Sequence, residues 1–144
     1  MGLKYDSEKV TRLSSVIFDA LVRLRELAAF KKEDLLAQPL LVGSAKYFLI
    51  VSVEAALDMC FHLISQNRWR VPKDYADTFR VMGDEGAFEP DFVKRLVEMA
   101  KFRNRLVHIY WDVDDDVIYE ILQDDIMDIE KFLNIFIELL NTGK

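Results

Sequence analysis

Apolar residues recur at alternating steps of three and four along most of this chain, and this spacing limits its fold more than any other feature. Near the N-terminus they form one helix face, made of Val10, Leu13, Ile17, Ala20, Leu24 and Leu27. Asp6 or Ser7 is the predicted N-cap, because a side-chain oxygen there can accept from the free backbone amides. Only 5 Gly and 3 Pro interrupt the 144 residues, which favours a few long helices.

The same period predicts four long helices and one short extra helix. In chain order, the expected elements after the first helix are a break with a short helical turn at residues 30–38, a long helix over about 40–65, a short helix over 74–82 ending at Gly83, a long helix beginning at Pro90, an acidic loop at 112–116, and one final long helix ending near Gly143. The simplest arrangement is an all-α, up-down four-helix bundle that forms a single domain over residues 1–144.

Hydrophobic residues make up 51% and charged residues 31% of the chain, a balance typical of a globular domain. The N-terminal residues show no apolar signal segment. The longest apolar stretch, residues 47–64, contains Glu54, Asp58 and His62, which are too many ionisable groups for an easy membrane span. We therefore expect a cytoplasmic protein without membrane contact, in which the lone Cys60 is a reduced core thiol.

The net charge of −6 argues against a protein that coats nucleic acid, because such proteins neutralise phosphates with a basic surface. The charge is unevenly distributed, however. Residues 94–105 include five bases and one acid, whereas residues 112–130 include nine acids and no base. A local basic patch could therefore contact an anion although the chain as a whole is acidic.

Arg103, His108 and Tyr110 form an Arg-x4-His-x-Tyr pattern. Histidine can move protons near neutral pH, and arginine offers a charged fork of donors that fits phosphate oxygens, so the pair suits metal-free cleavage of RNA. Residues five apart are turned by roughly 140° on a regular helix. Arg103 and His108 therefore share a site only if the helix ends or distorts between them, or if two copies of the chain form a composite site. Alternatively, Arg103 pairs with an acid and His108 caps a helix or packs in the core.

The segment from Phe102 to Tyr110 resembles the HepT toxins, which belong to the HEPN group of helical ribonucleases. Further similar segments are residues 47–49, 54–58, 62–64, 74–75, 83–86 and 128–132, so the resemblance covers most of the chain. It implies a HEPN/HepT-like bundle and a toxin that cleaves RNA as a metal-independent endoribonuclease, through attack of the ribose 2′-hydroxyl and without a cofactor. It also implies a symmetric homodimer and, as a partner, a minimal nucleotidyltransferase (MNT) antitoxin.

The resemblance also gives each residue of the pattern a role. Arg103 and His108 are the implied catalytic residues. Tyr110 is the residue that the antitoxin modifies with AMP, which silences the toxin because bulk and negative charge then lie where RNA phosphate should bind. The alternative for Tyr110 is a ring packed beside the neighbouring tryptophan. Asn104 either orients the phosphate or His108, or is an ordinary surface amide.

Glu54, Asp58 and His62 occur at steps of four and therefore lie along one face of the most apolar helix. Three interpretations stay open. The three side chains could ligate a metal, form a polar seam that accepts hydrogen bonds from Arg103 or orients His108, or form hydrogen bonds within a dimer interface. We favour the supporting role near Arg103, because buried charges normally have partners and the basic cluster is their natural source.

Two functions of other classes compete with the ribonuclease. One is a non-catalytic helical partner that binds a nucleotidyltransferase or its nucleotide substrate. Such four-helix proteins resemble this chain in fold but lack the Arg-x4-His-x-Tyr pattern, so the presence of that pattern favours the ribonuclease. The other is a purely structural bundle, in which no function depends on His108.

Overall fold

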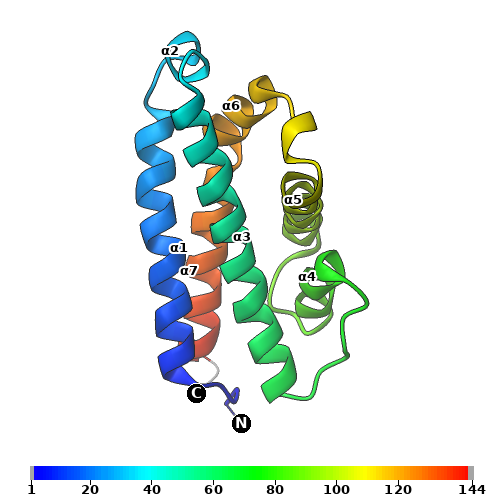
Figure 1. The fold of residues 1–144 in the computed structure, drawn as a ribbon. Coiled ribbons are helices and arrows are strands. Elements are labelled where there is room, and N and C mark those ends of the chain that lie inside the picture. Colours follow the sequence, from blue (N-terminus) through cyan, green and yellow to red (C-terminus); the bar gives the residue numbers. More distant parts are fainter. Residues whose placement is uncertain (1, 143–144) are drawn as a thin grey trace.

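The computed structural model describes residues 2–142, and every regular element in that part of the chain is a helix (Figure 1). The elements are α1 (Ser7–Ala28), α2 (Lys32–Leu36), α3 (Pro39–Gln66), α4 (Tyr75–Asp84), α5 (Pro90–His108), a short 3₁₀ helix η1 (Tyr110–Asp112), α6 (Asp115–Asp124) and α7 (Ile126–Thr142). The predicted all-α fold with long helices at α1, α3, α5 and α7 is confirmed.

Helix α3 lies at the centre of the bundle, in contact with every other α-helix. Helices α1, α3 and α7 run along the length of the molecule, whereas α4 and α5 pack on the far side of α3 (Figure 1). Helix α5 is seen nearly end-on in Figure 1, so it crosses the other long helices instead of running beside them. This crossing places the residues of α5 against the middle of α3.

The stripe predicted for α1 is buried as expected, with Leu13 partly buried at its edge. Asp6 is the N-cap, and its side chain accepts from the backbone amides of Glu8 and Lys9. Helix α3 is the one helix among the described residues whose length and hydropathy would allow it to span a membrane. In its most apolar 18-residue window, 61% is buried inside the bundle, as in the core helix of a globular protein.

The prediction of one continuous final helix is wrong, because the chain breaks at Asp125 into α6 and α7. Asp125 closes α6 through its amide, which donates to the carbonyl of Ile121 at 2.8 Å. Aspartate is a weak helix former because its side chain competes for backbone groups, so the pair Asp124 and Asp125 is a natural place for a break. The predicted end near Gly143 lies outside the described residues.

Gly83 does not end the short helix, as the sequence suggested, since α4 continues to Asp84. A Cβ atom at Gly83 would lie 2.7 Å from Cγ2 of Val93, so glycine there allows α4 to pack closely against α5. The turn is made instead by Gly86, whose φ of +80° favours a residue without a side chain.

Asp77 fixes the start of α4 to the preceding loop. It accepts from Arg70 Nη1 at 2.7 Å and from the Lys73 amide at 2.9 Å. These hydrogen bonds, the one from Arg70 first, hold the pKa of Asp77 below its ordinary value. Because the folded-state pKa is lowered, this stabilisation is complete above about pH 4 and is lost as the pH falls through the lowered pKa.

We therefore expect Asp77→Asn to reduce the free energy of unfolding by about 1–3 kcal/mol at neutral pH. Urea denaturation of both proteins should show this difference shrinking below about pH 4, where the wild-type carboxylate also loses its charge. Glu85→Gln, on an exposed residue just past α4, is the matched control and should change little. A difference between Asp77→Asn and wild type that stays constant down to about pH 3 would contradict the assignment.

Candidate functional site

Helix α5 presents the two residues of the predicted catalytic pair in different environments. The helix runs without a break from Arg103 to His108, which is its last residue, and Ile109 leaves helical geometry with φ −133° and ψ 47°. His108 is exposed, whereas the Arg103 side chain is 11% exposed. Because the helix is regular between them, the two side chains point in directions that differ by roughly 140°. Within one chain the predicted distortion between Arg103 and His108 is therefore absent.

Arg103 is held on three sides. Its Nη2 donates to Oε1 of Glu54 on α3 at 2.5 Å, and its Nη1 donates to Oδ1 of Asn104 at 2.9 Å. The guanidinium carbon lies 4.9 Å from the ring centroid of Tyr75, at the start of α4. The structure thus brings Glu54 and Asn104 to Arg103, as the supporting interpretation expects. A salt bridge of this kind also fits the purely structural alternative for Arg103.

Asp58 lies one turn beyond Glu54 on the same face of α3. The surrounding protein reduces its hydration, and this effect, followed by the charge of Glu54, raises the pKa of Asp58. The positive charges of Lys9 and Arg103 act in the opposite direction. Asp58 therefore belongs to the electrostatic surroundings of Arg103, but no hydrogen bond joins the two side chains in the described part of the chain.

His62 lies apart from this cluster. Its Nε2 accepts from the backbone amide of Asp6 at 2.9 Å, which attaches the segment before α1 to the end of α3. Burial and the nearby charge of Lys9 lower the pKa of His62, which favours the neutral form that can accept. Among residues 2–142, no three His, Cys, Asp or Glu side chains converge on a common point where a metal could bind. The interpretation of Glu54, Asp58 and His62 as one set of ligands therefore has no geometric support.

Tyr110 begins η1, directly after α5, and packs on α3. Lys46 Nζ lies 4.4 Å from the centroid of its ring and donates to the Tyr110 carbonyl at 3.4 Å. The Tyr110 hydroxyl approaches Gly43, where an added Cβ would lie 3.6 Å away. Tyr110 is 39% exposed, and its backbone carbonyl is held by Lys46.

Lys46 and Tyr75 were not predicted from the sequence. Lys46 is the only lysine or arginine in α3, and a single base in a long apolar helix is a recognisable signal. It is buried, with its Nζ 3.4 Å from Oδ1 of Asp115 at the start of α6. Tyr75 has no comparable signal, because its contact with Arg103 depends on how α4 packs on α5.

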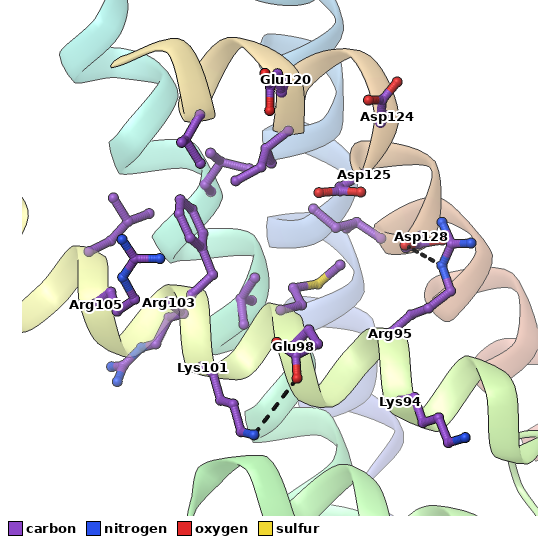
Figure 2. A pocket seen from close by; sticks show the side chains of 18 residues that line it. Lys94, Arg95, Glu98, Lys101, Arg103, Arg105, Glu120, Asp124, Asp125 and Asp128 are labelled. Carbon is purple, nitrogen blue, oxygen red and sulfur yellow. Dashed lines mark hydrogen bonds and ion pairs between the residues drawn. The ribbon is translucent and has the colours of Figure 1, made fainter. Parts of the chain in front are cut away.

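The basic cluster of residues 94–105 lies opposite acidic residues of the α6–α7 segment. A groove of about 630 Å³ runs between α5 and the α6–α7 segment, with Leu49 and Val53 of α3 among its lining residues. In Figure 2, Lys94, Arg95 and Lys101 follow one side of this groove, and Glu120, Asp124, Asp125 and Asp128 lie across from them. Arg95 Nε donates to Oδ2 of Asp128 at 2.9 Å across the gap.

This arrangement changes the interpretation of the basic patch. Burial, and then the charges of Asp128 and Asp124, raise the pKa of Asp125, as expected where carboxylates crowd together. The opposing acids attract the cations of α5 and repel a phosphate in the groove. The predicted basic patch is therefore partly neutralised by its own chain, because Arg95 pairs with Asp128 and Lys101 pairs with Glu98, as Arg103 does with Glu54.

Comparison with known proteins agrees with this architecture. Residues 17–135 match the family model described as Ribonuclease HepT-like. The mRNA nuclease HepT of Shewanella oneidensis is 24% identical over 82 residues, which cover 57% of this chain and 62% of that relative. The matched region thus spans less than two thirds of the curated relative.

Solved structures share the fold at low identity. A tri-AMPylated HEPN toxin of Shewanella oneidensis in complex with an MNT antitoxin has a TM-score of 0.83 at 19% identity, covering 90% of this chain and 97% of that one. A toxin–antitoxin complex solved with AMP-PNP has a TM-score of 0.84 at 18% identity, covering 91% and 98%. YutE of Bacillus subtilis, a cytosolic protein of unknown function, has a TM-score of 0.82 at 17% identity, covering 99% and 94%. Because the family model spans most of the chain, this protein belongs to the HepT-like ribonuclease family.

Proposed function

We propose that this chain is the toxin of a toxin–antitoxin pair and cleaves cytoplasmic RNA as a metal-independent endoribonuclease. The observation that carries this proposal is that one helix, α5, holds both an arginine oriented by Glu54 and Asn104 and an exposed histidine at its end. The first supplies fixed positive charge for a phosphate, and the second supplies a proton acceptor or donor. Membership of the HepT-like family supports the same chemistry.

The reaction needs two proton transfers. The ribose 2′-hydroxyl gives its proton to a base and attacks the adjacent phosphorus. The bond from phosphorus to the 5′-oxygen then breaks, and that oxygen takes a proton from an acid, which leaves a 2′,3′-cyclic phosphate. His108 can serve as base or acid, and Arg103 stabilises the negative charge that develops on the phosphate oxygens. Neither step requires a metal or a cofactor.

A homodimer resolves the divergence of Arg103 and His108. Two copies would supply two His108 side chains, one to accept and one to donate a proton, beside two Arg103 side chains. Exposed apolar residues near Tyr110 offer a surface for pairing, namely Leu40, Tyr47 and Trp111, which are 86%, 59% and 78% exposed. Sedimentation at micromolar concentration should give a dimer. A monomer under these conditions would contradict the composite site.

Tyr110 is the proposed target of inactivation by an MNT-type antitoxin. Transfer of AMP from ATP joins the tyrosine oxygen to the α-phosphorus and releases pyrophosphate. The attached AMP adds a negative charge beside the position of the substrate phosphate. Mass spectrometry should find one or more AMP units on Tyr110 only when the antitoxin is present with ATP. The role would be contradicted if Tyr110 stayed unmodified under these conditions. It would also be contradicted if the Tyr110→Phe variant carried the same modification at another residue.

Growth of a bacterial host after induction tests the toxin directly. Wild type should arrest growth, whereas His108→Ala and Arg103→Ala should not, although both accumulate to the same level. Lys101→Ala, on an exposed residue of α5 whose cation is paired with Glu98, should arrest growth like wild type. Equal, harmless behaviour of all four proteins would overturn the proposal and favour a non-catalytic partner of a nucleotidyltransferase.

A further inference from the structure

A hollow of about 320 Å³ lies next to Arg103, on the side of α4. It is lined by Phe61, Pro72, Asp74, Tyr75, Thr78 and Asn104, from α3, the loop after it, α4 and α5. We propose that this hollow binds one unpaired nucleobase of the RNA substrate, with Phe61 and Tyr75 as the stacking surfaces. The inference rests on the proposed ribonuclease function and adds the form of RNA that the site accepts.

The two aromatic residues of the hollow are about half exposed to solvent. Phe61 is 53% exposed and Tyr75 is 55% exposed, although most large apolar side chains of the chain are in the core. Aromatic side chains that border a hollow on the surface offer the flat faces on which unpaired bases stack. The volume lies at the lower end of the range for small-molecule pockets, about 300–1,000 Å³. It therefore suits a single planar ring system better than a helix or a folded loop of a protein partner.

The charges of the hollow favour a base over a phosphate. No lysine or arginine is among its lining residues in the described part of the chain. Asp74, whose Oδ1 accepts from the Asp77 amide at 2.7 Å, contributes a carboxylate that repels phosphate and can accept from the amino groups of a base. The hollow thus presents aromatic faces and hydrogen-bonding groups without a cation, which is the chemistry of base recognition.

Two contacts join the hollow to the proposed catalytic arginine. Tyr75 borders the hollow, and the guanidinium carbon of Arg103 lies over its ring, 4.9 Å from the ring centroid. Asn104 borders the hollow and accepts from Arg103 through Oδ1, which leaves its amide nitrogen to donate toward a base. A phosphate held by Arg103 would therefore have the base of the same or the next nucleotide within reach of the hollow. Since bases in a duplex are stacked and paired, the site should accept single-stranded RNA and reject duplex RNA.

The test measures binding, so that it does not depend on catalysis. The probe is a fluorescent single-stranded RNA hexamer, in which 2′-O-methyl groups block the proposed nucleophile. Its affinity for the wild-type protein is measured by fluorescence anisotropy. Phe61→Ala should weaken binding by about 5- to 150-fold, the loss expected for one stacked base. The Phe61→Trp variant should bind the hexamer with wild-type affinity. Phe18→Ala is the matched control, because Phe18 is 58% exposed on α1 and does not border the hollow.

Abasic substitution identifies what the hollow holds. Removing one base at a time from the hexamer should reveal one position whose loss weakens binding to wild type, and this loss should disappear in Phe61→Ala. If Phe61→Ala binds every hexamer as wild type does, the inference is wrong. It is also wrong if Phe61→Ala dissociates a dimer in sedimentation while the abasic pattern is unchanged, because a second copy then covers the hollow. Absence of RNA cleavage by wild type, with the abasic pattern intact, would overturn the ribonuclease and not the base site.

Discussion

Replacing His108 with alanine is expected to reduce the rate of RNA cleavage by about 10²–10⁴-fold without unfolding the protein, because the variant loses its proton-transfer group. His108 is exposed at the last position of α5, so its side chain contributes little to the packed core. The measurement is the initial rate of cleavage of a labelled single-stranded RNA, with circular dichroism to verify the fold.

The chain contains 2 histidines, which provides a matched control. His62→Gln keeps a hydrogen-bond acceptor for the Asp6 amide but removes the imidazole. It should cleave RNA at the wild-type rate, with a small loss of stability where the N-terminal segment joins α3. Cleavage by His108→Ala at the wild-type rate, or an equal loss in both variants, would show that His108 is not the proton-transfer group.

Phe132→Ala is expected to reduce the free energy of unfolding by about 3–5 kcal/mol, the usual loss for a fully buried phenylalanine. Phe132 on α7 is inaccessible to solvent, and its ring centroid lies 6.1 Å from that of Phe79, 5.6 Å from Phe88 and 5.7 Å from Phe136. These rings connect α7 with α4 and with the loop that precedes α5. The substitution would therefore leave a cavity where the two parts of the bundle meet.

Guanidinium denaturation measures this loss, with exposed Phe18→Ala as the control that should change stability by no more than about 0.5 kcal/mol. We also expect this cavity to lower the rate of RNA cleavage, because Tyr75 lies on α4 and Arg103 lies on α5. A loss of less than about 1 kcal/mol for Phe132→Ala would mean that the ring is not enclosed as described.

The spacing of apolar residues was sufficient to predict the long helices, because each buries one continuous face. The break at Asp125 was not predictable in the same way, since the apolar pattern continues across it from Leu122 to Ile126 and Ile129. Gly83 was misinterpreted for a related reason. A glycine near the end of a helix usually indicates a cap, and only the packing of Val93 reveals that close approach is its role here.

At the candidate site, the contact between Glu54 and Arg103 was anticipated because a carboxylate in an apolar helix was expected to be buried and to need a cationic partner. In the structure it is the Arg103 side chain that is enclosed, at 11% exposed, whereas that of Glu54 is 42% exposed. Sequence spacing alone placed His62 on the same face but could not reveal that its partner is the Asp6 amide, which comes from the segment before α1. Tyr75 and Lys46 were missed because their contacts depend on how α4 and η1 meet α3 and α5. The remaining roles of Arg103, His108, Asn104, Asp58 and Tyr110 stay predictions for experiment.

The most direct test of the account is the chemistry of the RNA ends in the presence of a metal chelator. Wild-type protein should cut single-stranded RNA in excess EDTA and leave a 2′,3′-cyclic phosphate on one fragment and a 5′-hydroxyl on the other. A substrate with a single 2′-deoxynucleotide before the scissile phosphate should stay intact at that position. Cleavage that requires added divalent metal, or that persists at the deoxynucleotide, would contradict a metal-independent reaction by Arg103 and His108.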